Sequence, residues 1–297
     1  MSNDVKTTML TPPHPTFIQI ETTIACNAEC PFCPHSTLTR RPRRMEDRVW
    51  KKIIDDTRGL GITYRPFLIN EPLADMRLGE IMRYIRQDDT ARIELNSNGE
   101  MMKIQRAEEI LDVGVDVIRF SVDGFTRETF EKSRVGLDFD TTVYRVQRFI
   151  ELAHKKGGAG KIELRMIGIP GTEDEQEKFV AFWSNLGVDA QITYFYKWAW
   201  DEGVEQVQLP CKKMLDEMFF YVNGKATLCC WDSHERAVVG DVSREHVLDI
   251  WHGAVNTRYR QLLAQGRRSE ILLCSKCEAY KDHKFEGFET PADTVTA

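Results

Sequence analysis

The first two thirds of the chain alternate between two hydrophobic periodicities. Short apolar runs with β-branched and aromatic residues are typical of strands, whereas apolar positions repeating every three or four residues are typical of helices. The predicted strands are 17–21, 67–70, 92–96, 117–122, 161–167 and 189–194, and the predicted helices are 46–58, 79–87, 104–113, 126–133 with 140–156, and 172–186. This alternation predicts an α/β fold with a parallel sheet and right-handed crossovers. Periodicity alone leaves open whether the sheet is open or curled into a partial barrel.

The pattern changes after residue 209. Two strand-like runs within 218–229 flank Asn223-Gly224, a dipeptide that favours a two-residue hairpin turn. A short strand-like segment and two helix-like segments follow, so the sequence predicts a small β-hairpin and helix domain after the α/β domain. The expected division is an N-terminal arm at 1–16, the α/β domain at 17–196, a linker at 197–210, the small domain at 211–280 and a tail at 281–297.

Two further runs stand out between these elements. The aromatic run 195–200 is expected to pack between the two domains, or else to line a substrate opening. The basic run 40–44 is expected to be a solvated loop, with contact to an anionic substrate or electron donor as the alternative.

Composition narrows the function classes. The chain has 297 residues with a formal net charge of −6, and this charge argues against non-specific nucleic-acid binding, which needs a basic face. No tract approaches the roughly 20 apolar residues of a membrane span, and residues 1–16 lack the apolar core of a signal peptide. We therefore expect a cytoplasmic protein that binds neither nucleic acid nor membrane.

The eight cysteines fall into two groups. Cys26, Cys30 and Cys33 lie near the start, and the other five lie near the end, at Cys211, Cys229, Cys230, Cys274 and Cys277. Because the cytosol keeps thiols reduced, such grouping indicates metal or cluster ligation rather than disulfides. The C-x3-C-x2-C triplet directly follows the first predicted strand. Three thiolates can hold three irons of a cubane cluster and leave the fourth iron open, whereas a triplet fits a zinc site or a disulfide framework poorly.

With Phe32, this triplet resembles the C-x3-C-x-aromatic-C motif of the radical S-adenosylmethionine (radical SAM) enzymes. The resemblance implies that S-adenosylmethionine (SAM) chelates the open iron of a [4Fe-4S] cluster and is cleaved reductively to a 5′-deoxyadenosyl radical. It also implies a partial (β/α)6 TIM-like barrel with the cluster loop after its first strand, and an electron supply from flavodoxin or ferredoxin.

Three later turns resemble SAM-binding turns of that family. Ile69-Asn70-Glu71-Pro72 stands where relatives carry a Gly-Gly-Glu-Pro-like turn, which places Asn70 and Glu71 near the methionine amino group. Asn96-Ser97-Asn98-Gly99 resembles a T-N-G turn, which adds Ser97 and Asn98. Phe120-Ser121-Val122-Asp123-Gly124 resembles S-x-D-G, where Ser121 would contact the ribose or carboxylate.

Two arginines are candidates for a carboxylate. Arg134 matches an R-x-G segment of relatives and would pair with the methionine carboxylate; the alternative is a surface arginine that closes a helix end. Arg165, on the fifth predicted strand, is expected to point into the barrel as a catalytic candidate. An unpaired charge there would be costly, so a substrate or cofactor carboxylate, or Glu163, is its expected partner.

The second cysteine group offers four thiolates, from Cys211, Cys229, Cys274 and Cys277, which suffice for a second cluster or for zinc. The segment resembles the shortened SPASM module called twitch, including Gly240-Asp241-Val242 and the pattern at 248–252. This resemblance implies one auxiliary [4Fe-4S] cluster, and the cysteine spacing is similar to that of radical SAM alcohol dehydrogenases acting on aminocyclitols. Cys230 remains. Neighbours on an extended strand face opposite ways, so it is expected to be a small buried residue or a hydrogen-atom donor facing the substrate.

These features predict a radical SAM oxidoreductase. The expected reaction removes a substrate hydrogen atom and passes the remaining electron to the auxiliary cluster, which oxidises an alcohol of a small sugar or aminocyclitol. The alternatives are modification of a ribosomal peptide, redox-neutral epimerisation with Cys230 as hydrogen donor, and a non-catalytic scaffold. The candidate proton acceptors are His14, His35, Glu71 and Arg165.

Overall fold

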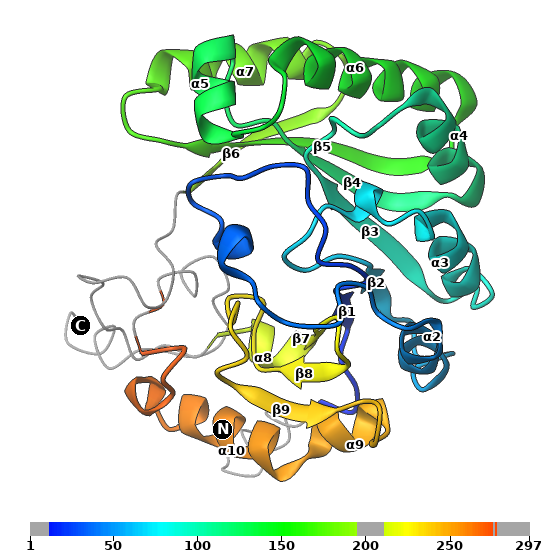
Figure 1. The fold of residues 1–297 in the computed structure, drawn as a ribbon, viewed down its shortest axis with the longest axis vertical. Helices are drawn as coiled ribbons and strands as arrows, with labels where there is room; N and C mark the ends of the chain where they lie inside the picture. The colour runs from blue at the N-terminus through cyan, green and yellow to red at the C-terminus, as the bar shows by residue number, and fades with distance from the viewer. Residues whose placement is uncertain (1–11, 195–210, 276, 278–297) are drawn as a thin grey trace, which may run out of the picture.

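A single curved sheet organises the protein in the computed structural model, which describes residues 12–194, 211–275 and 277. The described strands form one nine-stranded sheet in the order β6-β5-β4-β3-β2-β1-β7-β8-β9 (Figure 1). The strands are β1 Phe17–Ile20, β2 Thr63–Arg65, β3 Arg92–Ser97, β4 Val115–Ser121, β5 Ala159–Gly168, β6 Asp189–Tyr194, β7 Glu217–Phe220, β8 Lys225–Thr227 and β9 Val238–Asp241.

Helices cover the convex side of the sheet, and the loop after β1 lies on its concave side (Figure 1). The α-helices are α2 Asp47–Asp55, α3 Leu78–Ile85, α4 Ile104–Val113, α5 Arg127–Ser133, α6 Phe139–Lys156, α7 Glu173–Ser184, α8 Lys213–Asp216, α9 Val247–His252 and α10 Ala254–Ala264. The 3-10 helices are η1 Pro34–Thr37, η2 Pro72–Ala74 and η3 Arg268–Glu270. All neighbouring pairs from β1 to β6 are parallel, which confirms the predicted partial (β/α)6 barrel.

The second predicted strand is displaced. It runs over Thr63–Arg65 rather than over 67–70. Pro66 follows directly and has no N–H to donate to a sheet ladder, and the N–H of Phe67 bonds back to the carbonyl of Arg65 instead. The apolar residues that suggested a strand, Phe67 and Ile69, are buried beside the barrel cavity in a loop.

The predicted C-terminal hairpin is confirmed, but it joins the barrel sheet. β7 and β8 are antiparallel, and the turn between them contains Gly224 at φ 84°, a conformation that glycine adopts readily. β7 also pairs in parallel with β1, from Phe17 opposite Glu217 to Ile20 opposite Phe220. The C-terminal segment therefore extends the barrel wall, and its loops reach the same space as the loop after β1.

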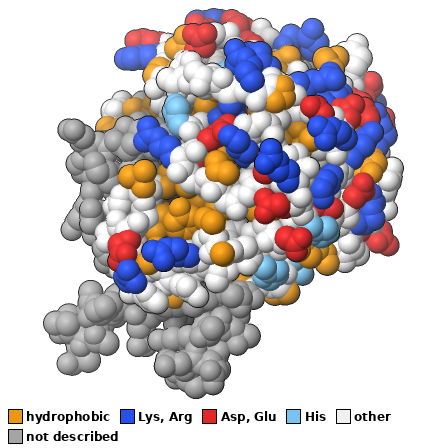
Figure 2. Space-filling view, turned by 60° about the horizontal axis from the view of Figure 1, so that its bottom comes forward, with side chains coloured by type: hydrophobic (Ala, Val, Ile, Leu, Met, Phe, Trp, Pro, Cys, Tyr) orange, Lys and Arg blue, Asp and Glu red, His pale blue; other side chains and the backbone are white. Residues whose placement is uncertain are grey.

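Alternation along the strands separates a packed core from a polar interior. Ile93 and Leu95 of β3 are fully buried, while Glu94 and Asn96, which alternate with them, turn to the opposite side. On the outer surface, Figure 2 shows basic and acidic side chains interspersed on one face. No helix among the described residues is long and apolar enough to cross a membrane. The aromatic run 195–200, the linker 197–210, the tail 281–297 and most of the N-terminal arm lie outside the described residues.

Candidate active site in the barrel

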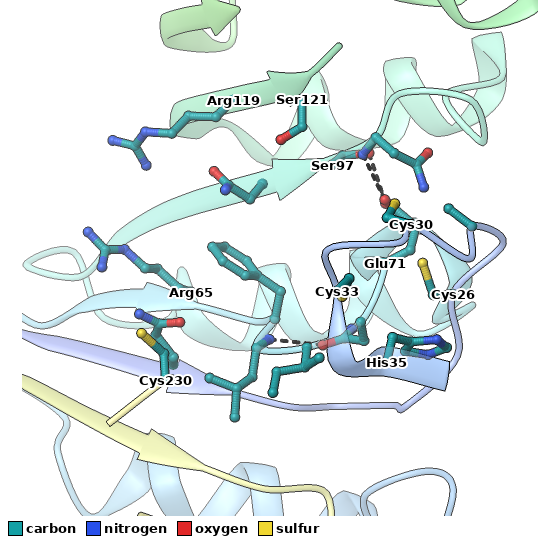
Figure 3. Close-up of a pocket in the computed structure, with 18 of the residues that line it drawn as sticks. Cys26, Cys30, Cys33, His35, Arg65, Glu71, Ser97, Arg119, Ser121 and Cys230 are labelled. Carbon is teal, nitrogen blue, oxygen red and sulfur yellow. Dashed lines mark hydrogen bonds between the residues drawn. The ribbon is translucent and has the colours of Figure 1, made fainter. Parts of the chain in front are cut away.

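One cavity of about 580 Å³ brings together most of the predicted site residues (Figure 3). It is enclosed by the loop after β1, the ends of β2 to β5 and the turn after β8. Its volume lies in the range of ligand pockets. The predicted residues that line it are Cys26, Cys30, Cys33, Asn70, Glu71, Ser97, Asn98, Ser121, Arg134, Arg165 and Cys230. Phe32 instead lines a separate hollow of about 550 Å³ together with Pro31 and Lys132, and Cys211, Cys229, Cys274 and Cys277 are also absent from the cavity lining.

The cysteine loop is held by backbone hydrogen bonds. The N–H of Cys33 donates to the carbonyl of Cys30 at 2.9 Å, and the N–H of Glu29 donates to the carbonyl of Val135 at 2.8 Å. Burial raises the pKa of Cys26 to about 11 and also raises the pKa of Cys33. Without a metal these thiols therefore stay protonated. Binding to a metal or cluster would stabilise their thiolate forms.

Glu71 joins the ends of β2 and β3. Its Oε1 accepts hydrogen bonds from the Leu73 N–H at 3.0 Å and the Ser97 hydroxyl at 2.8 Å, and its Oε2 accepts from the Asn98 N–H at 2.8 Å. Burial raises the pKa of this carboxyl group. The replacement of the expected glycines by Ile69 and Asn70 thus leaves the acidic residue anchored next to the cysteine loop.

Arg134 is buried beside the same loop. Its guanidinium lies 2.5 Å from Asp123 Oδ2, donates to Cys30 Sγ at 3.6 Å, and sits 5.5 Å from the centre of the Phe32 ring. The backbone of Arg134 does end α5, but only 15% of its side chain is exposed. The alternative of a surface arginine is therefore wrong. Phe32 thus contacts a residue of the cavity wall although it does not line the cavity itself.

The opposite end of the cavity carries arginines that sequence reasoning missed. Figure 3 places Arg65 and Arg119 with Cys230 at the end away from the cysteine loop. Glu94 Oε2 accepts from Arg65 Nε at 2.9 Å and from Arg119 Nη1 at 2.8 Å. Charged residues stand at alternate positions in β3 and β5, which is typical of a polar barrel interior, but β2 and β4, which carry Arg65 and Arg119, show no such alternation.

Arg165 belongs to the same network. Its Nη2 donates to Glu163 Oε2 at 2.8 Å, and the same oxygen accepts from Arg119 Nε at 2.7 Å. The expectation that Glu163 is a partner of Arg165 is thus met, while the Nε of Arg165 is buried and has no hydrogen-bond partner among the described residues.

The thiols of the second cysteine group lie within electrostatic range of one another. Cys211 interacts with Cys277, Cys229 with Cys211, and Cys274 with both Cys211 and Cys277. Burial raises the pKa of Cys211 to about 11 and that of Cys274 to about 12. Cys274 is buried and the other three cysteines are half-buried, and together they offer the four thiols of a fully ligated iron–sulfur cluster, although among the described residues no three such side chains are arranged closely enough to hold a metal ion.

Cys229 and Cys230 differ from the expected arrangement. β8 ends at Thr227, so the two cysteines lie in a turn rather than on an extended strand. Their thiols are close enough to shift each other's pKa, and Cys230 lines the cavity. The expectation of a small residue packed in the core is therefore wrong, and Cys230 stands between the cavity and the second thiol group.

The candidate proton acceptors are separated by their positions. His35 lines the cavity and its Nε2 lies 2.7 Å from the Ile24 carbonyl, whereas His14 is absent from the lining and its Nδ1 lies 3.0 Å from the Pro15 carbonyl. Glu71 already accepts three hydrogen bonds. Arg165 donates a hydrogen bond to Glu163, and a guanidinium group has no acceptor atom to offer.

The cavity fits SAM and a cluster. Three thiols line it at one side, and its lining residues carry four buried polar atoms without a partner among the described residues: Asn70 Nδ2, Asn96 Oδ1, Arg134 Nε and Arg165 Nε. Buried polar atoms are normally hydrogen-bonded, so these atoms indicate that a polar ligand completes the site. The carboxylate, amides and guanidinium groups suit the amino, carboxylate and hydroxyl groups of SAM.

Comparison with known proteins agrees with this geometry. The chain is 22% identical over 270 residues to an S-adenosyl-L-methionine-dependent 2-deoxy-scyllo-inosamine dehydrogenase of Niallia circulans, over 88% of this chain and 91% of that protein. It is 29% identical over 109 residues to a PqqA peptide cyclase of Streptomyces rochei, over 36% of this chain and 30% of that protein.

Solved structures share the fold at lower identity. BtrN in complex with AdoMet and 2-DOIA matches with a TM-score of 0.62 and 17% identity, over 89% of this chain and 93% of that one. The enzyme anSMEcpe with bound AdoMet matches with a TM-score of 0.67 and 14% identity, over 91% of each chain.

Two family matches cover the two cysteine groups. Residues 20–182 match the radical SAM superfamily, and residues 211–278 match SPASM, an iron–sulfur cluster-binding domain. The radical SAM domain binds SAM and a [4Fe-4S] cluster, and the SPASM domain binds auxiliary iron–sulfur clusters. The prediction of a radical SAM enzyme with both cofactors is confirmed. Because the first match spans more than half of the sequence, the chain belongs to the radical SAM superfamily and carries a C-terminal SPASM domain.

Proposed function

We propose that the chain oxidises an alcohol of a small polar metabolite, of sugar or aminocyclitol type, to a ketone. The observation that carries this proposal is that Cys230, from the C-terminal cysteine group, lines the same cavity as Cys26, Cys30 and Cys33. A substrate in this cavity lies between the two cysteine groups. The similarity to a 2-deoxy-scyllo-inosamine dehydrogenase over most of both chains supports the same reaction class.

The residues divide into three sets. Cys26, Cys30 and Cys33 would hold the first cluster, with Asn70, Glu71, Ser97, Asn98, Ser121 and Arg134 around SAM. Cys211, Cys229, Cys274 and Cys277 would hold one auxiliary cluster. When bound, these groups supply a 5′-deoxyadenosyl radical that takes a hydrogen atom from the substrate and an acceptor for the remaining electron, while the hydroxyl proton leaves to a base.

Arg165 positions the substrate in this proposal. Its guanidinium is held at Nη2 by Glu163, while its Nε is buried without a partner, so the side chain is fixed and still has a donor to offer. A donor at this place orients a hydroxyl or a developing carbonyl oxygen of the substrate, since electrostatic stabilisation works best from groups that need not reorganise. Electrons for the first cluster would come from flavodoxin or ferredoxin.

Two other reactions use the same residues. The similarity to a PqqA peptide cyclase supports modification of a peptide as a second candidate. The position of Cys230 at the cavity supports epimerisation, in which its thiol would return a hydrogen atom to the substrate.

Product mass separates these reactions. The reconstituted enzyme is reduced anaerobically with SAM and panels of aminocyclitols, sugars and peptides in D2O, and products are analysed by mass spectrometry. The proposal predicts a small-molecule product two hydrogens lighter than its substrate, with one deoxyadenosine formed per product. A product that keeps its hydrogen count and gains one deuterium would show epimerisation, and a modified peptide would show the second candidate; either would overturn the proposal.

A further inference from the structure

The end of the cavity away from the cysteine loop contains more positive than negative side-chain charge. Arg65, Arg119 and Arg165 meet there through two carboxylates, Glu94 and Glu163. Each arginine has a carboxylate partner, but three guanidinium groups on two carboxylates leave an excess of one positive charge.

Neighbouring charges do not remove this surplus. Glu217 approaches Arg65 at 3.3 Å but is matched by Lys213 at 3.1 Å. Lys161 approaches Glu163 at 3.0 Å but is matched by Asp189 at 2.6 Å. Both pairs are balanced in themselves, so the three arginines still exceed their carboxylates by one charge.

Burial makes the surplus costly. The side chains of Arg65 and Arg119 are each 15% exposed, those of Glu94 and Glu163 are 10% and 5% exposed, and that of Arg165, which reaches the cavity, is 34% exposed. Burying an excess charge away from water costs free energy. An anion that accepts hydrogen bonds from the arginines offsets that cost.

The donors needed for such an anion are present. Glu163 Oε2 holds both Arg119 and Arg165, which fixes these two guanidinium groups next to each other on adjacent strands. Arg119 donates to the carboxylates through Nε and Nη1, and Arg165 donates through Nη2. These hydrogen bonds do not use Nη2 of Arg119 or Nη1 of Arg165. The buried Nε of Arg165 has no acceptor among the described residues. Guanidinium groups fixed in this way suit a carboxylate or a phosphate.

We propose that the substrate carries an anionic oxygen group, a carboxylate or a phosphate, that docks against Arg119 and Arg165. This inference rests on the proposed function and narrows its two substrate types to one: a sugar-type alcohol that bears an oxyanion, in place of an aminocyclitol. An ammonium group at this end would face three arginines and would be repelled.

Binding to the unreduced enzyme tests the inference without turnover. D-glucuronate, D-glucose 6-phosphate, D-glucose and D-glucosamine share one ring and differ at one substituent, and each is titrated into reconstituted, SAM-loaded protein by calorimetry. The proposal predicts that one of the two anionic sugars binds at least about tenfold more tightly than D-glucose and D-glucosamine, since hydrogen bonds to charged groups are the stronger ones. The tighter of the two identifies the group as carboxylate or phosphate. Equal binding of all four, a preference for D-glucosamine, or no binding at all would overturn it.

Variants locate the anion. Arg165→Gln is expected to weaken binding of the preferred anionic sugar about tenfold, and to weaken it more than it weakens binding of D-glucose. Arg165→Lys, which keeps the charge, is expected to retain part of the affinity. Arg92→Gln removes the same charge from a side chain at the start of β3 that is 59% exposed and absent from the cavity lining, and it serves as control. Unchanged anion binding in Arg165→Gln would contradict the proposal. The product-mass assay decides the proposed function separately, because binding here requires no radical.

Discussion

Arg40 forms a two-pronged ion pair with Glu21, from Nε to Oε2 at 2.6 Å and from Nη2 to Oε1 at 2.7 Å. The third arm of the guanidinium, Nη1, donates to the Ser233 carbonyl at 2.6 Å, and Glu21 also accepts from the Val222 N–H at 3.1 Å. The two side chains are 5% and 0% exposed. Arg40 follows the first cysteine group, and Ser233 follows Cys229 and Cys230, so this pair ties the two cysteine-bearing loops together.

Removing Arg40 should be costly. Arg40→Met leaves Glu21 buried without its counter-charge, and breaking such a pair typically costs about 3–5 kcal/mol. We expect a loss of this size in the free energy of unfolding, measured by chemical denaturation. Arg41→Met, at the exposed neighbouring arginine, is the matched control and should change stability little. A loss below about 1 kcal/mol in Arg40→Met would contradict the structural role of the pair.

Glu71 is predicted to govern SAM affinity. Glu71→Gln keeps the shape but removes the charge, and it places an amide N–H₂ among groups that all donate to Glu71: the Leu73 and Asn98 N–H groups and the Ser97 hydroxyl. We expect SAM binding, measured by calorimetry on the reconstituted protein, to weaken at least about tenfold. Glu80→Gln, at a half-exposed carboxylate on α3, controls for the charge change. Equal SAM affinity in both variants would show that Glu71 lies outside the cofactor contacts.

Glu163 makes stability depend on pH. Burial by itself opposes its ionisation, but the hydrogen bond from Lys161 and the charges of Arg119 and Arg165 outweigh burial and lower the pKa of Glu163 to about 2. A carboxyl group with a lowered folded-state pKa contributes stability above its ordinary value of 4.5, and that contribution is lost as the pH falls from 4.5 toward 2. The shift corresponds to about 3 kcal/mol.

Denaturation curves between pH 6 and pH 3 test this point. The wild type should lose stability more steeply than Glu163→Gln, whose side chain does not titrate. Parallel curves for the two proteins would show that the network around Glu163 adds no pH-dependent stability.

Cys229 and Cys230 should respond differently to mutation. Under the proposed oxidation, Cys229→Ala removes a ligand of the auxiliary cluster and should lower the iron content by up to about four per chain, with loss of product. Cys230→Ala should keep the iron and the oxidised product. A Cys230→Ala enzyme that still forms deoxyadenosine but gives no product would favour a hydrogen-donating role for Cys230, and with it epimerisation.

The parts of the fold that were predictable are those with local signals. The strand and helix periods, the Asn223-Gly224 turn and the cysteine triplet each occupy a few neighbouring residues, and the parallel sheet follows from their order. The pairing of β7 with β1 was not predictable, because it joins residues about two hundred positions apart and leaves no local pattern. The second strand was misplaced because buried loop residues such as Phe67 and Ile69 are as apolar as strand residues.

The site shows the same division. Sequence motifs were enough to predict that Glu71, Ser97 and Asn98 lie together. The ion pairs of Arg65 and Arg119 with glutamates of neighbouring strands depend on the register between those strands, which no motif encodes. The basic run 40–44 was expected to be solvated, yet Arg40 is buried in the ion pair with Glu21. Nothing in the sequence distinguishes the one buried arginine from the exposed arginines beside it, because its partner Glu21 is about twenty residues away.

The central claim is a two-cluster radical enzyme, and iron counting with deoxyadenosine analysis tests it most directly. Wild type and a Cys26→Ala/Cys30→Ala/Cys33→Ala variant are reconstituted anaerobically with iron and sulfide, and each is then assayed with SAM and a reductant, alongside EPR. The account predicts about eight irons in the wild type, about four in the variant, and deoxyadenosine from the wild type alone. About four irons in the wild type and none in the variant would contradict it, because the C-terminal thiols would then hold no cluster to accept the substrate electron.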